Sequence, residues 1–222
     1  MDEIYAIIPV SKFKHAKTRL SPFLNEKERE NLLKAMLKDV TDTLKNHIDK
    51  IILISADEDV LNYANQLKIS TIKENDNSNL NKAIGQAMNY CKNKTKKVLI
   101  TPSDIPLIKK IDMKLLTEKS KKYESVISPS KGGGTNILII KPEAIETKFG
   151  DFSFIKHLKE IEKSKLNYYI FDSFFIALDV NTTEDLGEII VHGNNTKTKE
   201  YLESINIKVE SIHGSERLKV NR

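Results

Sequence analysis

Apolar runs without polar alternation recur along this chain and constrain its fold more than any other feature. Clear examples are residues 4–10, 51–54 and 98–100, each bounded by polar residues. Strands of this kind are buried on both faces, as in a parallel sheet covered by helices. Segments with helical spacing of apolar residues lie between the runs. The alternation predicts an α/β fold, a three-layer α/β/α sandwich around a mostly parallel mixed sheet.

Apolar spacing and turn residues also predict the individual elements. We expect strands at 4–10, 50–55, 69–72, 96–100, 125–128, 136–140, 168–171 and 174–180. We expect helices opening at 25–28 and 57–59, then at 80–91, 111–119 and 153–163, and one opening at 182–185. The tail suggests a last helix and a strand that either complete the sheet edge or reach across a homodimer. We interpret residues 1–222 as one domain, with 193–222 as a C-terminal extension.

The composition is that of a globular protein. The 222 residues are 39% hydrophobic and 30% charged, and no apolar run approaches the roughly 18 residues that cross a bilayer. Residues 1–4 lack the basic and apolar regions of a signal peptide. The single cysteine, Cys91, excludes an internal disulfide and a cysteine-cluster zinc site. We therefore expect a cytoplasmic enzyme without membrane association.

Two aspartates are expected where strands end. Asp104 follows the run 98–100 between two prolines, and Asp179 lies near the end of the predicted strand 174–180. Ligands of open α/β sheets bind outside the carboxyl ends of the strands. A single aspartate there often caps the next helix, but a pair suits Mg2+, which takes one or two carboxylates together with substrate phosphates. If the strand continues, Asn181 shares the face of Asp179 and would add a neutral oxygen ligand.

The loop after the first strand is basic and contains no glycine. In doubly wound folds this loop holds phosphates, normally through the backbone amides of a glycine-rich turn. Neither the Walker A motif nor the dinucleotide fingerprint fits here. Phosphates would have to be held by side chains, and the candidates are Lys12, Lys14, Lys17 and Arg19. A solvated basic loop is the alternative. The net charge of +5 fits a small polyanionic substrate as well as it fits nucleic acid.

Two glycine-containing turns are further candidates for ligand contact. Three glycines at 132–134 let the backbone approach a ligand closely, beside the Thr135 hydroxyl. Gly150 and Ser153 lie where a predicted helix begins, and its N-terminal amides suit a phosphate or carboxylate. A plain hairpin and an ordinary capped helix are the alternatives. No histidine pair with metal-ligand spacing and no serine nucleophile elbow is recognisable.

Several short motifs, in order from Ile4 to about Leu186, jointly resemble the 2-phospho-L-lactate guanylyltransferase family. They are Pro9-Val10, Ala16-Lys17-Thr18-Arg19-Leu20-Ser21, Leu80-Asn81, Pro102-Ser103-Asp104-Ile105-Pro106-Leu107, Gly134-Thr135-Asn136, Phe149-Gly150 with Ser153 and His157, and Asp179-Val180-Asn181-Thr182. The run that begins at Ala16 is the most diagnostic. One departure concerns Asn181, where the family usually has Asp. A neutral amide there weakens one expected metal ligand without removing the site.

The resemblance implies a nucleotidyltransferase fold of the glycosyltransferase-A-like kind. It also implies transfer of GMP from GTP to 2-phospho-L-lactate with release of pyrophosphate. The product, lactyl-2-diphospho-5′-guanosine, feeds the biosynthesis of the deazaflavin coenzyme F-420. By the same resemblance Asp104 and Asp179 hold Mg2+, Thr135, Gly150 and Ser153 hold the phosphorylated acceptor, Leu80, Asn81 and Ser103 lie near the guanosine, and Lys17 and Arg19 lie near the triphosphate.

Other functions stay open at this point. A related guanylyltransferase acting on phosphoenolpyruvate or 3-phosphoglycerate would differ mainly in its acceptor pocket. Molybdenum-cofactor and sugar nucleotidyltransferases use other nucleotides and acceptors, and the glycine-free first loop argues against them. An RNA-binding module would need a basic face and aromatic residues exposed on the sheet, whereas the strands here look buried on both faces. A catalytically inactive partner subunit draws its support from Asn181.

Overall fold

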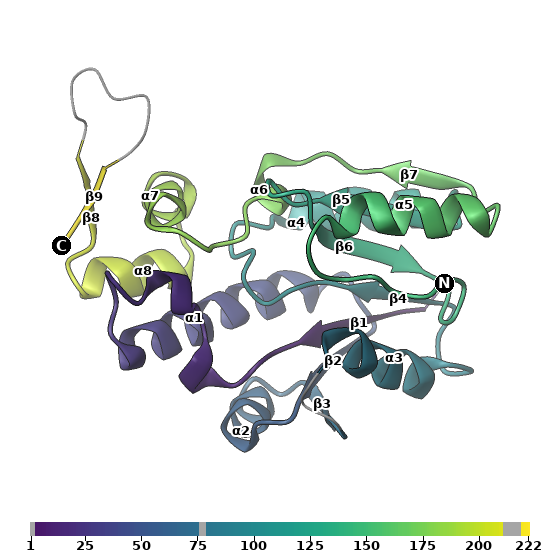
Figure 1. Ribbon diagram of the computed structural model, residues 1–222, viewed down its shortest axis with the longest axis horizontal. Helices are drawn as coiled ribbons and strands as arrows, with labels where there is room; N and C mark the ends of the chain where they lie inside the picture. The colour runs from purple at the N-terminus through teal and green to yellow at the C-terminus, as the bar shows by residue number, and fades with distance from the viewer. Residues whose placement is uncertain (1–2, 76–78, 211–218) are drawn as a thin grey trace.

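A computed structural model of the chain describes residues 3–75, 79–210 and 219–222. One sheet of seven strands has the order β3-β2-β1-β4-β6-β5-β7 (Figure 1). Its strands are β1 (Ile4–Pro9), β2 (Lys50–Ser55), β3 (Ser70–Lys73), β4 (Lys97–Ile100), β5 (Ser125–Pro129), β6 (Thr135–Ile140) and β7 (Tyr168–Ile170). Only β6 runs antiparallel to its neighbours in this sheet, β4 and β5. The mostly parallel mixed sheet is therefore confirmed.

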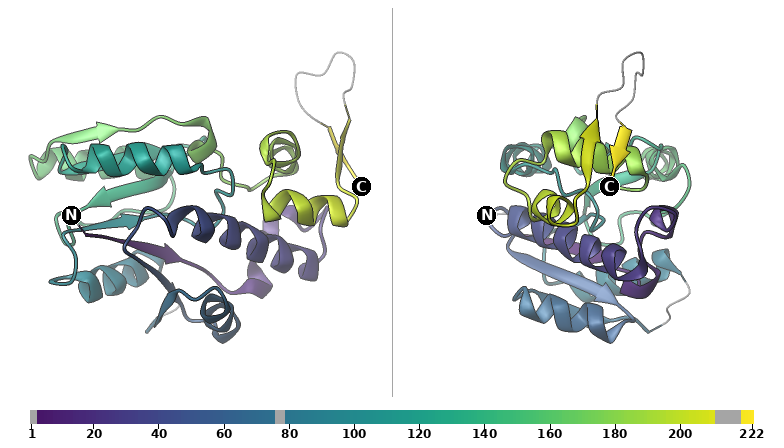
Figure 2. Two further views of the ribbon diagram at one scale, coloured as in Figure 1. Left: turned by 180° about the vertical axis from the view of Figure 1, so that it is seen from behind. Right: turned by 90° about the vertical axis from the view of Figure 1, so that its left-hand side faces the viewer.

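Helices cover both faces of the sheet. They are α1 (Glu26–Leu44), α2 (Glu58–Gln66), α3 (Leu80–Cys91), α4 (Lys110–Ser120), α5 (Ser153–Lys163), α6 (Phe174–Ala177), α7 (Thr183–His192) and α8 (Lys197–Ser204). Helices α1, α2 and α4 share one hydrophobic core with the sheet, and α3 and α5 share the other. In Figure 1 helices α3 and α5 lie on the near side of the sheet. The left view of Figure 2 shows the molecule from behind, with α1 in front of the sheet.

The strand residues divide between these two cores by alternation. Ile8 of β1 belongs to the core under α1, whereas its neighbour Ile7 belongs to the core under α3. Successive side chains of a strand point to opposite faces, so a strand covered on both sides must be apolar at every position. This explains the uninterrupted apolar runs, and the three-layer sandwich that they predict is confirmed.

The chain reverses its direction of travel across the sheet between β1 and β4. It moves from β1 outward to β2 and β3, and α3 then returns it to β4 on the other side of β1. The carboxyl ends of these two adjacent parallel strands therefore form a topological switch point, where open α/β sheets bind their ligands. The loop after β1 and the segment with Asp104 both start there.

Two expected elements are wrong. Residues 174–180 do not form a strand: α6 covers Phe174–Ala177, and the chain then continues in irregular structure through Asp179. In the part of the tail that the structure describes, no strand extends the main sheet. Helix α8 packs on α1, and β8 (Lys208–Glu210) pairs with β9 (Lys219–Asn221) in a separate antiparallel sheet. Among the helices of the described residues, none combines the length and the apolar character that crossing a bilayer requires.

Candidate active site

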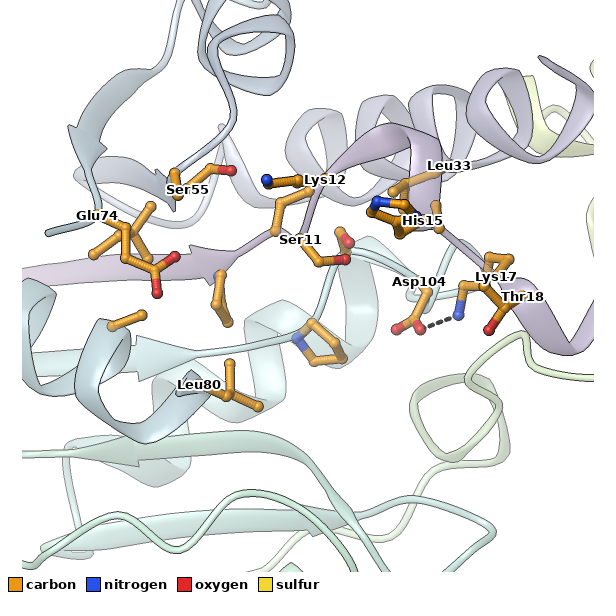
Figure 3. Close-up of a pocket in the computed structure, with 18 of the residues that line it drawn as sticks. Ser11, Lys12, His15, Lys17, Thr18, Leu33, Ser55, Glu74, Leu80 and Asp104 are labelled. Atoms are coloured by element: carbon orange, nitrogen blue, oxygen red, sulfur yellow. Dashed lines mark hydrogen bonds and ion pairs between the residues drawn. The ribbon is translucent and has the colours of Figure 1, made fainter. Parts of the chain in front are cut away.

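A pocket of about 730 Å³ lies at the switch point. Its wall comes from the end of β1, the loop that follows it, the residues after β2 and β3, the start of α3 and the segment after β4 (Figure 3). Among the predicted site residues, those that line it are Lys12, Lys17, Arg19, Leu80, Ser103, Asp104 and Asn181. The pocket thus brings together residues from distant parts of the sequence at the sheet edge that the sequence singled out.

The basic loop owes its shape to buried apolar anchors. Phe13, Ala16 and Leu20 are buried, and two short 3-10 turns, Phe13–His15 and Thr18–Leu20, carry the chain between them. From α1, the Arg29 guanidinium donates to the carbonyls of Ala16 at 3.2 Å and Leu24 at 2.7 Å, which fixes the loop against the helix. The basic side chains fall between the anchors, and those of Lys12, Lys14 and Arg19 are exposed.

The four basic candidates are not equivalent. Lys12 and Arg19 are exposed and line the pocket, whereas Lys14 is exposed and does not line it. Lys17 differs because it adopts a left-handed backbone conformation, with φ of 50°, and its side chain is only 9% exposed. Its ammonium group is directed inward, toward the carboxylate of Asp104.

Lys17 joins the two segments that carry the predicted metal ligands. Its Nζ donates to Asp104 Oδ2, to the Val180 carbonyl and, at 3.4 Å, to Asn181 Oδ1. The amide of Asn181 in turn donates to Asp179 Oδ2. The backbone completes the junction, since Val180 N donates to the Asp104 carbonyl at 3.0 Å. Asp179 therefore lies beside Asp104 although no strand delivers it there.

Two oxygens of this cluster fit a hard divalent cation. Asp104 Oδ1 and Asp179 Oδ1 are buried and have no hydrogen-bond partner. A buried carboxylate oxygen left unpaired is costly unless a cation neutralises it. No group of three or more His, Cys, Asp or Glu side chains gathers as a metal site within the described residues. A pair of carboxylates agrees with Mg2+, which completes its coordination with water and substrate phosphates.

Asp185 holds the segment with Asn181 in place. Its buried carboxylate accepts hydrogen bonds from the backbone of Asn181 at 2.7 Å and of Thr182 at 2.8 Å, and it pairs with the Lys131 ammonium. The helix expected to open at 182–185 is therefore confirmed, and it begins with a capping box between Thr182 and Asp185. Because Lys131 belongs to the glycine-rich turn before β6, this carboxylate also links the two regions of the candidate site.

The predicted acceptor residues form a second cluster, outside the lining of the large pocket. Ser153 Oγ donates to Thr135 Oγ1 at 3.3 Å, and His157 Nδ1 lies 2.9 Å from the same oxygen. His157 Nε2 accepts from Lys148 N at 2.9 Å, so Nδ1 carries the ring proton and donates to Thr135. Thr135 accepts two hydrogen bonds and keeps its own hydroxyl proton for a third partner.

Gly150 and Asn81 connect this cluster to α3. Gly150 has φ of +125°, a conformation that side chains other than hydrogen rarely allow. Asn81 does not line the large pocket. Its amide donates to the Phe149 carbonyl at 2.9 Å and accepts from Phe149 N at 2.8 Å. Asn81 thus clamps the turn before Gly150 to α3, a backbone role that its motif did not indicate.

A family model described as guanylyl transferase CofC like matches residues 4–222. The chain belongs to this guanylyl transferase family. Relatives named 2-phospho-L-lactate guanylyltransferase support the assignment. The one from Methanobrevibacter smithii is 68% identical over 100% of this chain and 99% of the relative. The one from Methanothermobacter thermautotrophicus is 51% identical over 98% of this chain and 97% of the relative. The family resemblance of the sequence motifs is confirmed.

Solved structures share the fold of this guanylyl transferase. A protein from Desulfovibrio desulfuricans G20 described as a nucleotide-diphospho-sugar transferase superposes with a TM-score of 0.76 at 16% identity, covering 93% of this chain and 96% of that one. The 4-diphosphocytidyl-2C-methyl-D-erythritol synthase of Anaerococcus prevotii gives 0.58 at 15% identity, covering 91% and 99%. At these identities the likeness shows the fold alone, and the predicted nucleotidyltransferase fold is confirmed.

The guanylyl transferase site also contains residues that the sequence motifs did not single out. Ser55, the last residue of β2, and Glu74, directly after β3, line the pocket. Arg29 and Asp185 do not line the pocket. Arg29 holds the backbone of the loop after β1, and Asp185 holds the backbone of the segment with Asn181. A carboxylate directly after a strand of a parallel sheet was a usable signal for Glu74. Nothing in the local sequence distinguishes Arg29 from other helix arginines.

His157 makes the stability of this guanylyl transferase depend on pH. Burial lowers its pKa to about 4, whereas an unfolded chain has a His pKa of roughly 6.5. The unfolded state therefore binds the proton first as the pH falls, and stability present above pH 6.5 is lost toward pH 4. We expect a loss of about 2 kcal/mol between pH 7 and pH 5, measured by urea unfolding. His157→Gln should flatten this slope, whereas His192→Asn, at an exposed site, should keep it. An unchanged slope in His157→Gln would contradict the assignment.

Proposed function

We propose that this protein transfers GMP from GTP to 2-phospho-L-lactate, with release of pyrophosphate. The observation that carries the proposal is the pocket at the switch point, where a basic loop meets a pair of carboxylates with unpaired buried oxygens. The names of relatives at 51% and 68% identity support the same nucleotide transfer and the same acceptor. The product would be lactyl-2-diphospho-5′-guanosine, the intermediate that the family resemblance places in coenzyme F-420 biosynthesis.

The chemistry needs little from the protein beyond charge and position. A phosphate oxygen of the acceptor attacks the α-phosphorus of GTP, and the bond from that phosphorus to the bridging oxygen breaks. Pyrophosphate leaves with the bonding electrons. The acceptor phosphate is already ionised at neutral pH, so no general base has to remove a proton. Catalysis then consists of in-line placement and neutralisation of the developing negative charge.

The described side chains divide this work. Lys12, Lys17 and Arg19 would bind the triphosphate with charge-assisted hydrogen bonds. Asp104 and Asp179, with Asn181 beside them, would hold Mg2+, and Mg2+ when bound supplies positive charge to the phosphates.

Ser103 and Leu80 line the large pocket, where the nucleoside would lie. The acceptor would be held in the second cluster, outside that pocket. Thr135 offers its free hydroxyl proton, with Ser153 and the Gly150 turn next to it, to the phosphate or carboxylate of the acceptor.

The direct test is pyrophosphate release from GTP and Mg2+ with each of three acceptors: 2-phospho-L-lactate, phosphoenolpyruvate and 3-phosphoglycerate. ATP and CTP serve as nucleotide controls. We expect release with GTP and 2-phospho-L-lactate above all other pairs. A preference for phosphoenolpyruvate or 3-phosphoglycerate would reassign the acceptor and keep the nucleotide transfer. No release from folded protein with any pair would contradict the proposal and direct the next test to RNA binding.

A further inference from the structure

The pocket has two chemically different ends. Lys17 and Asp104 lie at one end, Glu74 lies at the opposite end, and Lys12 lies between them. Figure 3 shows the Glu74 carboxylate directed into the pocket, with Ser55 and Leu80 on either side of it. A triphosphate is attracted to the ammonium groups of Lys12 and Lys17 rather than to the carboxylate of Glu74. A nucleotide bound here is therefore oriented with its base toward Glu74.

The backbone at Glu74 is held rigidly. Glu74 follows β3 directly, and its N–H donates to the Ser55 carbonyl of β2 at 2.8 Å. Gln86 of α3 fixes the residues on both sides of it: its amide donates to the Lys73 carbonyl at 2.9 Å and accepts from Asn75 N at 3.0 Å. One side chain thus ties both flanking peptides to α3. A backbone fixed in this way suits a side chain that must bind a ligand in one orientation.

The wall beside Glu74 suits a flat aromatic ring. Leu80 is 46% exposed although it opens a helix whose other large apolar residues are mostly buried. Its side chain faces the pocket, where Ala83 and Pro102 add further apolar surface. An apolar wall with a carboxylate at its edge is the arrangement that fixes a ligand by burial and orients it by hydrogen bonds.

The carboxylate distinguishes guanine from the other bases. An ionised carboxylate only accepts hydrogen bonds, through two oxygens. Guanine presents two adjacent donors, N1–H and the N2 amino group, which match the two oxygens. Adenine and cytosine present a ring nitrogen acceptor where guanine has N1–H, and that acceptor would face the carboxylate without a proton. We infer that Glu74 selects GTP by accepting hydrogen bonds from guanine N1–H and N2–H. This inference rests on the proposed function, because it assigns the base specificity of the same nucleotide site.

Replacing the carboxylate of Glu74 by a carboxamide tests the inference in two ways, because it should weaken GTP binding and strengthen XTP binding. Glu74→Gln replaces one acceptor oxygen by a donor. Xanthine carries a carbonyl in place of the guanine amino group, so a carboxamide matches its N1–H and O2. We expect the dissociation constant for GTP to rise by roughly 100-fold in Glu74→Gln, since a site built for a hydrogen bond strongly disfavours a mismatched group. XTP should bind this variant more tightly than it binds the wild type, so that the order of preference reverses.

The controls separate a failure of this inference from a failure of the proposed function. Glu58→Gln removes an exposed carboxylate that pairs with Lys73 outside the pocket, and it should keep the wild-type preference. Glu74→Ala should bind GTP and ITP about equally, because inosine lacks only the amino group. Nucleotide binding is measured at equilibrium without acceptor, so it reports on Glu74 even if no acceptor is turned over. A Glu74→Gln protein that still prefers GTP over XTP overturns the assignment of Glu74, whatever the acceptor assay shows.

Discussion

Asp104→Asn is expected to lower kcat for GMP transfer by at least about a thousand-fold. The substitution keeps the shape of the side chain and removes its charge. Asp104 donates no hydrogen bond that the change would break, but it supplies a buried unpaired oxygen and the carboxylate that pairs with Lys17. An amide at this position neither attracts a divalent cation strongly nor orients the Lys17 ammonium. The measurement is pyrophosphate release at saturating GTP, acceptor and Mg2+.

A matched control is available on α2, which does not line the pocket. Asp59→Asn removes an exposed carboxylate from the first turn of α2, and it should leave kcat near the wild-type value. Binding of Mn2+ in the presence of GTP gives a second readout, and the Asp104→Asn protein should bind Mn2+ more weakly. Near-normal turnover of Asp104→Asn at saturating Mg2+ would remove Asp104 from the site.

Lys17→Ala is expected to lower kcat/KM for GTP by about a thousand-fold, within the range seen when a group that neutralises a transferring phosphoryl is removed. Lys17 differs from the other basic residues of the loop because its ammonium group is already buried among the carboxylate segments. It is placed to neutralise charge where the α-phosphate would react. The loss should appear both in kcat and in the equilibrium affinity for GTP.

Lys45→Ala is the control for the loss of a positive charge. Lys45 is exposed just beyond the end of α1 and pairs only loosely with Asp42, at 3.4 Å. It should change neither parameter measurably, because exposed pairs of this kind contribute little. If Lys17→Ala retained wild-type GTP kinetics, the basic loop would not belong to the nucleotide site.

The sequence predicted that Asp179 lies near Asp104, but it predicted the wrong secondary structure for the segment that brings Asp179 there. A short apolar run such as 174–180 fits a buried strand or a buried helix turn, and periodicity cannot separate the two. Tertiary contacts decide: Asn136 of β6 donates to the Ile176 carbonyl at 2.7 Å, and Lys131 N donates to that of Ala177 at 2.9 Å. These contacts join residues about forty positions apart, so no local pattern reveals them.

The strands that carry the pocket were predictable for the opposite reason. Burial on both faces makes the central positions of β1, β2 and β4 apolar, and that pattern is visible in a short window of sequence. The order of the strands is not visible there. Glu74 becomes a pocket residue only because β3 lies at the edge of the sheet with its carboxyl end on the same side as that of β1. The sequence shows a Glu just after a predicted strand, but it does not show which strand end lies beside it.

The contact between Lys17 and Asp104 ties the proposed metal site and the proposed nucleotide site to one side chain. The Lys17 ammonium is the counter-ion of the carboxylate segments and bonds Asp104 through Oδ2, which leaves Asp104 Oδ1 for a cation. A divalent cation held by Asp104 and Asp179 would repel that ammonium, and a bound triphosphate would draw the same ammonium toward itself. Each ligand would then favour the position of Lys17 that the other one needs. Thermodynamic linkage requires that the metal would then tighten GTP binding by the same factor by which GTP tightens metal binding.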